Sequence, residues 1–522
     1  MTDSNRVLII GGGHNGLVCA AYLAKAGQKV TVLEAANQVG GMAATREFAP
    51  GFKASCAHLL YLLDAGISKD LSLASRGLSL AKTGLDTIAL AKNGKHITLS
   101  SDTVEGPGLA DEDRTAYRDY RRSMSKFAAL IGELNQQVPQ RITNRPKDLI
   151  TLGKLALKTR LMGRDDMREF LRITGINIHD VLEEKFQNGL LKGALSLDAV
   201  LGSFSAPRSN NTVFTALHRM SGNNSGPAGD LSIPAGGMGA VTAAMAAAAQ
   251  NAGADIRTGC KVRRILVDGM VTSGVELESG EQIAAGTVVS NADPKTTLLG
   301  LLGARHVEAE FARRFNNVRS KGNAAKLHLA LDGLPGFSGL EPEQLGQRLV
   351  IAPDLDYVDR AFNHCKYGEF SARPVMEITL PSVHDTSLAP EGKHVLSAIV
   401  QYAPRELGAG WSEGKAAFFE TVMAVLSNYA PDIRDRTIAS ELLTPEDLEN
   451  TFSVSGGHWH HGELSLDQFL MLRPVPKAAQ YAMPVDGLYL CGAGCHPGGG
   501  VMGSAGKNAA KVILSDRRGS ET

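Results

Sequence analysis

The sequence contains no cysteine pair with the spacing of a redox or metal motif. Its six cysteines are scattered through 522 residues, at Cys19, Cys56, Cys260, Cys365, Cys491 and Cys495, and no two of them form a CxxC pair. A disulfide framework is therefore not expected, which suits a reducing compartment. The nearest two, Cys491 and Cys495, follow a predicted strand, and we interpret them as small packing residues; the alternative is a redox-active dithiol.

A net charge is also absent. The 54 basic and 54 acidic residues balance, so the composition carries no electrostatic footprint for nucleic acid, and no nucleic-acid partner is expected. A hydrophobic fraction of 43% is ordinary for a soluble protein. No targeting segment precedes the first predicted strand, so the expected location is the cytoplasm.

No long hydrophobic run indicates a membrane span near the N-terminus. Residues 7–26 come nearest, but three consecutive glycines followed by His14 and Asn15 interrupt them, and hardly any basic leader precedes them. Neither a signal peptide nor a spanning helix is favoured. The same residues instead predict the start of a nucleotide-binding fold.

The first 34 residues predict a strand, a glycine turn, a helix, a second strand and an acid. These are Val7–Ile10, Gly11-x-Gly13-x-x-Gly16, Leu17–Ala26, Val30–Leu33 and Glu34. This order is the one that a dinucleotide fold needs. A bare glycine motif would be weak evidence in a chain with 57 glycines, and a glycine-rich turn in an ordinary α/β unit would not account for Glu34.

Each residue of this motif has an expected role. Gly11 permits the tight turn, Gly13 lets the backbone approach a pyrophosphate, and Gly16 lets the helix pack on the strand. The helix N-terminus offers free N–H groups to the phosphates. Glu34 is placed to accept hydrogen bonds from ribose hydroxyls, and its charge would repel a 2′-phosphate.

A second glycine loop follows at once. Gly40, Gly41 and Met42 again put bare backbone beside a ligand, which a long flavin dinucleotide needs and a plain nicotinamide domain does not. With this loop the sequence resembles the FAD-dependent amine oxidase and phytoene desaturase superfamily, and in particular its phytoene dehydrogenase-related branch. The specific pieces are Gly456–Gln468 and Gly492–Gly503.

The resemblance implies FAD as the cofactor and a set of contacts to it. The implied contacts are Gly11, Gly13, Asn15, Gly16, Glu34, Gly40, Gly41, Met42, Val262, Gly494, Cys495, Gly500, Val501 and Met502. In such proteins Val262 lies beside the adenine through its main chain. The turn after the last strand holds the ribityl-phosphate and places N–H groups near the ring edge that becomes negative on reduction.

The predicted fold class is α/β. A discontinuous, Rossmann-like FAD-binding domain would use residues 1–75, 230–300 and 470–522. An inserted substrate domain of mixed sheet plus helices would use residues 76–229 and 301–469. Its expected helices include Asp111–Val138, Lys147–Gly163, Asp166–Ile173, Asn177–Asn188, Leu190–Leu201, Gly414–Tyr429 and Pro445–Phe452. Its expected strands include Thr87–Leu90, His96–Leu99, Ala325–Leu331, Pro374–Leu380 and His394–Gln401.

Residues 147–172 are basic and amphipathic. Such a stretch could dock on an anionic membrane surface, or it could be a solvated helix face over a core. Animal relatives implied by the resemblance are linked to mitochondria, whereas this chain is expected in the cytoplasm or at the inner face of a membrane. Its oligomeric state is not indicated by the sequence.

The sequence does not identify catalytic residues. By family placement His58, His461 and Glu463 are the candidates, and His496 is expected to orient the last glycine loop. Three histidines and two acids lie between His458 and Asp467, but their spacing matches no standard zinc pattern, so no metal is expected. We expect this segment to be a polar loop whose histidines hydrogen-bond to each other, to backbone and to water.

The resemblance implies an FAD enzyme acting on an apolar, isoprenoid- or lipid-like substrate by desaturation, hydride transfer or isomerisation. One alternative is an amine oxidase, although no clear pair of aromatic residues near the C-terminal motif would cage an amine. The other is a non-catalytic regulatory or scaffold protein that contains FAD. No separate NAD domain is visible, so electrons would pass to oxygen, a quinone or a diffusible acceptor unless the reaction is redox-neutral.

Overall fold

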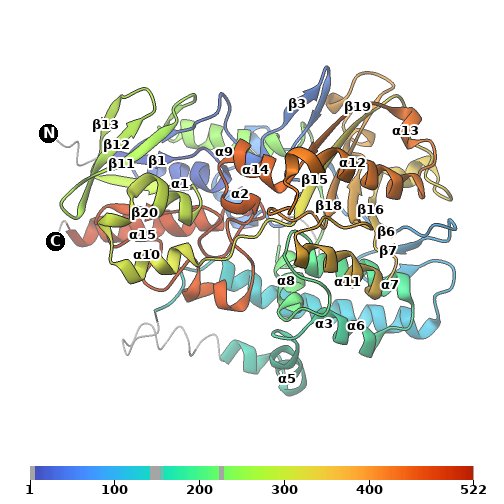
Figure 1. Cartoon of the computed structure of the whole chain (residues 1–522). Coiled ribbons are helices and arrows are strands. Elements are labelled where there is room, and N and C mark those ends of the chain that lie inside the picture. Colours follow the sequence, from blue (N-terminus) through green and yellow to red (C-terminus); the bar gives the residue numbers. More distant parts are fainter. Residues whose placement is uncertain (1–5, 142–152, 154–156, 223–228, 521–522) are drawn as a thin grey trace.

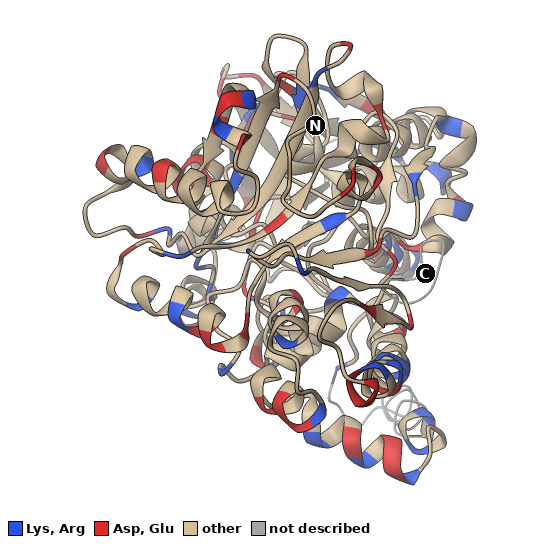
Figure 2. Ribbon diagram, turned by 90° about the vertical axis from the view of Figure 1, so that its right-hand side faces the viewer, with Lys and Arg blue, Asp and Glu red and all other residues tan. Residues whose placement is uncertain are grey.

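The chain is built around two sheets that lie side by side, with a block of helices beneath the second (Figure 1). This is seen in a computed structural model that describes residues 6–141, 153, 157–222 and 229–520. Basic and acidic residues are interspersed over both halves of the ribbon (Figure 2). No helix in the described ranges combines the length and the apolar character needed to cross a membrane.

The first sheet has five parallel strands. In spatial order they are β10 (Asp255–Arg257), β2 (Lys29–Leu33), β1 (Arg6–Ile10), β14 (Thr287–Ser290) and β20 (Leu488–Leu490). Three helices pack together on it: α1 (His14–Lys25), α9 (Met238–Asn251) and α15 (Ser504–Ser520). A short antiparallel sheet of β11 (Val262–Asp268), β12 (Val271–Leu277) and β13 (Gln282–Ala284) adjoins it. The predicted α/β, Rossmann-like class is confirmed.

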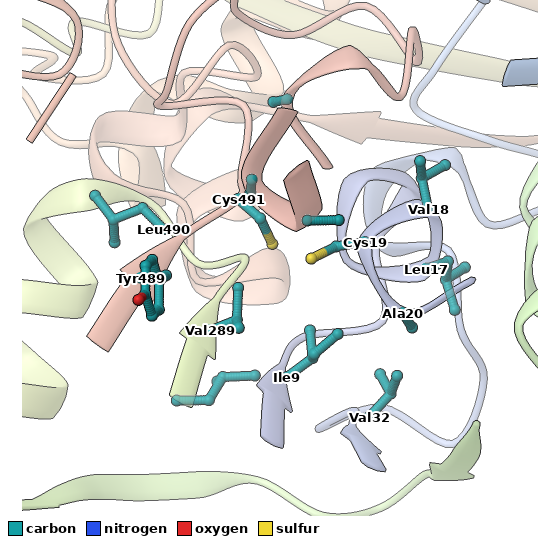
Figure 3. Close-up of a cluster of buried hydrophobic side chains, with 14 of the residues drawn as sticks. Ile9, Leu17, Val18, Cys19, Ala20, Val32, Val289, Tyr489, Leu490 and Cys491 are labelled. Carbon is teal, nitrogen blue, oxygen red and sulfur yellow. The ribbon is translucent and has the colours of Figure 1, made fainter. Parts of the chain in front are cut away.

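The core of this half is apolar and contains two facing thiols. Ile9 and Val289 come from neighbouring strands and have no exposed surface, as does Cys19 on α1. Figure 3 shows the sulfur of Cys491, directly after β20, pointing toward that of Cys19. All six cysteines are unbridged, and Cys491 is fully buried. The neighbour of Cys491 in space is thus Cys19 rather than Cys495, which shows that sequence spacing did not indicate the nearest thiol.

The second sheet has eight strands. In spatial order they are β19 (Thr437–Leu443), β15 (Ala324–Leu331), β18 (His394–Gln401), β17 (Val375–Thr379), β16 (Arg348–Ile351), β6 (Thr87–Ala89), β7 (Ile97–Leu99) and β8 (Val104–Glu105). One face buries Leu327, Ala398 and Ile378 against helix α12 (Trp411–Ser427). The other face looks toward the interior between the two sheets. The predicted mixed sheet plus helices is therefore present.

Helices cover the remaining sides. The block below the second sheet comprises α3 (Asp111–Asn135), α5 (Arg164–Ile173), α6 (Ile178–Lys185), α7 (Gly189–Val200), α8 (Thr212–Arg219) and α11 (Leu355–Asn363). Shorter helices are α2 (Ala65–Asp70), α10 (Ala309–Asn316), α13 (Ile433–Arg436) and α14 (Pro445–Phe452). The remaining strands are β3 (Arg46–Ala49), β4 (Phe52–Ala54), β5 (Leu80–Lys82) and β9 (Ile233–Pro234). The helix predicted over 147–163 lies largely outside the described residues.

Candidate active site

A single cavity of about 650 Å³ runs from the first glycine loop to the inner face of the eight-stranded sheet. The first half is lined by both N-terminal glycine loops, Glu34, Val262 and the last glycine turn. The second half is lined by Tyr61, Arg219, Lys326, Glu377, Trp459 and apolar side chains. The cavity therefore joins a nucleotide-type cradle to a chamber with buried charges.

The cradle has polar atoms that no described residue satisfies. Asn15 is 1% exposed, yet neither its amide nitrogen nor its amide oxygen has a partner among the described residues, and the same holds for His14 Nε2. Burial lowers the pKa of His14 to about 3, so its ring is neutral. Buried polar groups are normally hydrogen-bonded. At the N-terminus of α1, where free N–H groups and the positive dipole end converge, the phosphates of a dinucleotide would supply these missing partners.

Glu34 braces the glycine loop. Its Oε2 accepts a hydrogen bond from the Gly12 N–H at 2.7 Å, and its Oε1 accepts one from the Ala36 N–H at 2.8 Å. A carboxylate has about four acceptor positions, so lone pairs remain for ribose hydroxyls. The acid at the end of β2 thus shapes the loop as well as facing the cavity.

The second glycine loop lies directly beside the first. The Gly40 N–H donates to the Gly12 oxygen at 2.8 Å, and Gly13 and Gly40 form a parallel bridge. Gly40 has φ +120°, and a Cβ there would stand 2.7 Å from Thr242 Oγ1. Only glycine fits this position without displacing α9. The sequence predicted bare backbone beside a ligand at this loop, and the close approach of Thr242 explains why Gly40 has no side chain.

The predicted cofactor contacts fall into two groups. Those that line the cavity are Gly11, Gly13, Asn15, Glu34, Gly40, Gly41, Met42, Val262, Gly500 and Val501. The others, Gly16, Gly494, Cys495 and Met502, are not among its lining residues. Gly494 and Cys495 are buried behind the wall, where a Cβ on Gly494 would stand 2.2 Å from Pro294 Cδ. Their role in this structure is to let the last turn pack closely.

The histidine-rich loop is a buried wall of the cavity. His458 and His460 are 1% and 8% exposed, so the loop is buried. Its histidines bond to one another as expected, since the His460 N–H donates to His458 Nδ1 at 3.3 Å. Burial keeps the pKa values of both rings well below their usual range. The His461 N–H donates to the His458 oxygen at 2.8 Å. Residues that are distant in the sequence cover the loop, and their contacts cannot be recognised from its polar composition.

Arg473 holds this wall to the last glycine turn. Its guanidinium is 1% exposed and donates to the main-chain oxygens of His460 (2.7 Å), Ala493 (2.9 Å) and Cys495 (3.1 Å). Further bonds reach other carbonyls of residues 462–468. Because the five N–H groups of arginine have fixed directions, they set the spacing between the two loops.

His58 forms a pair with a buried lysine. Lys326 Nζ on β15 lies 2.6 Å from His58 Nδ1, and Lys326 is 2% exposed. Burial lowers the pKa of Lys326 to about 7 and holds the pKa of His58 well below its usual range. His58 Nε2 is buried without a partner among the described residues. The pair can therefore hold or release a proton near neutral pH.

Glu377 on β17 lies in a network of buried charges. Its Oε2 accepts from Arg219 Nη2 at 2.5 Å and from Arg348 Nε at 2.6 Å. Both arginines also pair with Asp198. The pKa of Glu377 is lowered by these guanidinium groups against the opposing effect of burial, so it stays ionised. The guanidinium of Arg219 also lies 4.6 Å from the ring centre of Tyr61.

The other sequence candidates lie in different places. His461 lines the cavity, whereas Glu463 is not among its lining residues and forms an ion pair with Arg319 at 2.9 Å. His496 is fully buried, with Nε2 2.9 Å from the Leu134 oxygen, and its own oxygen accepts from Tyr481. These bonds hold the last glycine turn in place, as expected for a residue that orients the loop.

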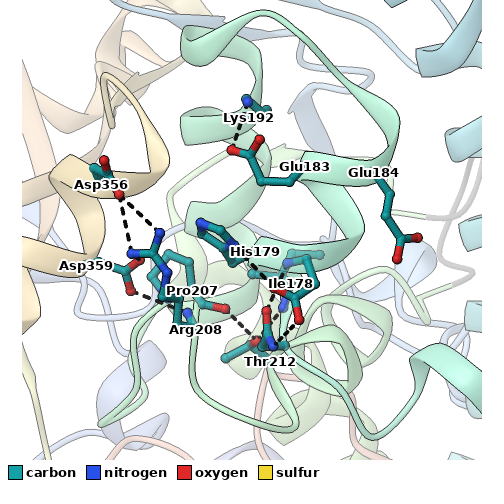
Figure 4. Close-up of polar contacts among 12 residues, drawn as sticks. Ile178, His179, Glu183, Glu184, Lys192, Pro207, Arg208, Thr212, Asp356 and Asp359 are labelled. Atoms are coloured by element: carbon teal, nitrogen blue, oxygen red, sulfur yellow. Dashed lines mark hydrogen bonds and ion pairs between the residues drawn. The ribbon is translucent and has the colours of Figure 1, made fainter.

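One cluster outside the cavity has metal-type ligands. His179, Asp356 and Asp359 bring three ligand atoms close together (Figure 4). Arg208 already pairs with both carboxylates, at 3.3 Å and 2.9 Å. One guanidinium thereby offsets part of the charge of the two carboxylates. This cluster ties the loop before α8 to helix α11.

Sequence reasoning missed Lys326, Glu377, Arg219 and Arg473. A signal for three of them exists. Lys326 stands in Ala-Ala-Lys-Leu-His-Leu-Ala-Leu and Glu377 in Val-Met-Glu-Ile-Thr. A lone charge within a strand that is otherwise apolar is costly to bury unless it serves a purpose. Arg473 is likewise a lone charge in an apolar run, Phe-Leu-Met-Leu-Arg-Pro-Val-Pro, whereas no comparable local signal marks Arg219, which lies in an ordinary amphipathic helix.

Comparison with known proteins agrees with this geometry. A family model for flavin containing amine oxidoreductases matches residues 16–514. The chain is 35% identical to pyridine nucleotide-disulfide oxidoreductase domain-containing protein 2 of Rattus norvegicus, over 98% of this chain and 93% of the rat protein. It is 24% identical to the lycopene-forming phytoene desaturase of Pantoea ananas, over 97% and 99% of the two chains.

A solved structure shows the same fold. Putrescine oxidase bound to putrescine aligns with a TM-score of 0.62 at 14% identity, covering 99% of this chain and 100% of that one. The predicted superfamily and the predicted FAD cofactor are both confirmed by the family match. The residues that line the cradle fit that cofactor, since they offer phosphate-binding N–H groups, unpaired polar atoms and an acid at the ribose position. The chain therefore belongs to the family of flavin-containing amine oxidoreductases, and its cofactor is FAD.

Proposed function

We propose that this FAD-dependent oxidoreductase acts on an apolar, isoprenoid- or lipid-like substrate, by desaturation, hydride transfer or isomerisation. The observation that carries the proposal is the second half of the cavity, which is open to the cofactor cradle and lined by Leu201, Ile399, Leu448, Phe452, Val454 and Trp459. Apolar walls bind apolar chains by removing them from water. The similarity to a phytoene desaturase supports this substrate class.

The chain's own residues would bind the substrate and handle protons. FAD, when bound, supplies the acceptor for a hydride or for electrons. Residues of the two N-terminal glycine loops and Glu34 hold the cofactor. The apolar wall orients the substrate and excludes water, while Lys326 and His58 take up or return a proton. An NAD site is not part of the proposal, so the expected electron acceptors are oxygen, a quinone or a diffusible carrier.

An amine oxidase is the main rival. Against it, the face of Tyr61 is already covered by Arg219, which lies 4.6 Å from the ring centre, and Arg348 adds a second buried guanidinium. Both features oppose a positively charged amine. The remaining rival is a regulatory or scaffold protein in which FAD is never reduced.

One experiment separates these functions. The holoenzyme is mixed without oxygen with a panel of isoprenoid hydrocarbons, fatty acyl compounds and primary amines, and the visible flavin absorbance is recorded. Bleaching by an isoprenoid or lipid supports the proposal. Bleaching by amines alone, with peroxide released in air, identifies an amine oxidase. If none of the compounds bleaches the flavin, and the isoprenoids are recovered without isomerisation, the result favours the scaffold protein.

The role of Glu34 gives a direct test of the cofactor cradle. Glu34→Ala should weaken FAD binding by about 1–3 kcal/mol, because the ribose loses charge-assisted hydrogen bonds and the Gly12 N–H loses its acceptor. Fluorescence titration of the apoprotein with FAD measures the change. Glu391→Ala, at an exposed surface position, is the control. FAD retention equal to wild type in the Glu34 variant would show that the acid does not contact the cofactor.

We also propose peripheral contact with an anionic membrane, through the described part of residues 147–172. Leu157, Leu161 and Leu171 are 55%, 75% and 67% exposed. Arg160, Arg164 and Arg168 are exposed beside them. Exposed leucines flanked by arginines are the pattern of a surface that inserts between anionic headgroups. A location in the cytoplasm or at the inner face of a membrane remains our expectation.

The membrane proposal predicts binding to vesicles. Replacement of Leu161 and Leu171 by glutamine should weaken binding to phosphatidylserine-containing vesicles at least about 30-fold, measured by co-sedimentation, since two fully inserted leucines contribute about 2–6 kcal/mol together. Tyr367→Gln removes an equally exposed apolar residue elsewhere (82% exposed) and should change nothing. Equal sedimentation of all three proteins, or no binding by wild type, would contradict the proposal.

A further inference from the structure

The floor of the substrate chamber is a buried sheet face that carries charged side chains among its apolar ones. Lys326 on β15 pairs with Ile399 on β18, which pairs with Glu377 on β17, so the three side chains share one face. Ile399 lies between the other two, so the backbones at Lys326 and Glu377 are two strand spacings apart, which is about 10 Å. The opposite face of the same strands is largely apolar. Polar residues on a buried face indicate a polar group above them.

Glu377 has one oxygen with no protein partner. Arg219 and Arg348 both donate to Oε2, whereas Oε1 is buried and has no hydrogen-bond partner within the described part of the chain. Glu377 is 1% exposed and lines the cavity. Leaving an ionised oxygen buried and unpaired is unfavourable by several kcal/mol. A hydrogen-bond donor on the bound substrate would remove this cost.

The charges around the chamber limit what that donor can be. Arg219 and Arg348 are balanced by Glu377 and Asp198, while Lys326 has no carboxylate within ion-pair distance in the described ranges. A substrate ammonium would add a positive charge to a site with no spare negative one. A substrate carboxylate would face Glu377. A neutral hydroxyl avoids both conflicts, because it can donate to Glu377 and accept from Lys326 or His58.

We infer that the substrate carries a hydroxyl group at the end that enters this chamber, and that Glu377 Oε1 accepts its hydrogen bond. Glu377 is then a residue that determines substrate specificity. The inference rests on the proposed function, since it concerns the same chamber and refines the apolar substrate to one with a polar end. It excludes a pure hydrocarbon as the preferred ligand.

The test compares three probes of equal size on the FAD-loaded protein. 1-Octanol donates and accepts, its isomer heptyl methyl ether only accepts, and octylamine is a cation at pH 7.5. Dissociation constants come from the rise in Tm with probe concentration. We expect 1-octanol to bind at least tenfold more tightly than either of the others, because the ether has no donor for Glu377 and the ammonium of octylamine adds an unbalanced positive charge.

A substitution at Glu377 tests whether this residue causes the preference for the alcohol. Glu377→Gln should weaken 1-octanol binding at least fivefold and leave the ether unchanged. Glu276→Gln, which removes another buried carboxylate paired with an arginine but far from the chamber, is the matched control. If the Glu377 variant fails to fold, the ranking of the three probes by wild type still decides the question.

Three results would overturn the inference. Equal affinity for the alcohol and the ether would mean that the alcohol makes no hydrogen bond to Glu377. Tighter binding of octylamine would identify an amine site. No binding of any of the three probes would exclude the chamber as a hydroxyl site. None of these measurements requires turnover. A protein that ranks the probes as expected, but neither reduces its flavin nor isomerises any isoprenoid or lipid, would therefore refute the proposed function and leave this inference standing.

Discussion

Gly16→Ala should remove FAD from the purified protein. A Cβ at this position would lie 2.3 Å from the Gly11 carbonyl oxygen and 3.3 Å from Asn291 Cβ, so the backbone of the first glycine loop has to move. Overpacking of this kind costs about 1–3 kcal/mol. Because the strain falls on the loop that faces the phosphates, we expect the affinity for FAD to fall about 10- to 100-fold.

The expected loss of FAD affinity cannot be explained by the helix propensity of the new residue. Alanine is a better helix former than glycine by about 1 kcal/mol, so without the clash the substitution would stabilise α1. Gly300→Ala is the control, since a Cβ there meets nothing within 4 Å. The measurements are the ratio of visible to ultraviolet absorbance and the far-ultraviolet circular dichroism. A folded variant with full FAD content would show that helix α1 does not need to approach β1 as closely as the structure indicates.

Lys326→Met should stabilise the protein at neutral pH, and the gain should disappear in alkali. The folded pKa of Lys326 is lowered to about 7 by burial, whereas an unfolded lysine titrates near 10.4. Between these values the unfolded state binds one more proton than the folded state. Stability of the wild type therefore rises with pH by about 1.4 kcal/mol per unit across this window, and the cost of the lysine is greatest below pH 7.

The expected difference is large. At pH 7 the methionine variant should be more stable by about 3–5 kcal/mol, less the lost contact with His58 Nδ1, and the difference should shrink as the pH approaches 10. The charged or titratable groups coupled to this lysine include His58, His328, Cys56 and Glu377. Urea unfolding of both proteins at several pH values measures the effect, with the exposed Lys511→Met as control. A difference that does not vary with pH would mean that Lys326 stays protonated.

The same lysine predicts the pH dependence of turnover. If neutral Lys326 takes up a proton from the substrate, the rate of flavin reduction by an active member of the substrate panel should rise through about pH 7. The methionine variant should lack this rise. A profile that is unchanged in the variant would assign the proton transfer to another group.

The cofactor half of the site could be predicted because its determinants are local. A strand, three glycines at fixed offsets, a helix and a terminal acid are contiguous in the sequence, and each has one stereochemical purpose. Gly40 and Gly41 follow within seven residues of Glu34. The predicted contacts that do not line the cavity, such as Gly494, still lie in the right turn. Sequence alone cannot distinguish a glycine that touches a ligand from one that lets the wall pack.

The substrate half could not be predicted because its residues meet only through long-range pairing. Lys326 and His58 are 268 positions apart, and Arg219 and Glu377 are 158 apart. The strands that carry Lys326 and Glu377 are central in an eight-stranded sheet, and their order is not evident from the sequence. The burial of the histidine-rich loop was not evident from the sequence for a similar reason, because the surrounding segments are distant from it along the chain.

The binding of FAD in the cradle formed by the glycine loops is the basis of the proposed function. The measurement that tests it is the visible absorption spectrum of the freshly purified protein, with the released cofactor identified after heating. We expect a yellow protein that releases FAD, about one molecule per chain. A colourless protein that also fails to take up added FAD would contradict the account, because the unpaired polar atoms of Asn15 and His14 would then need another ligand.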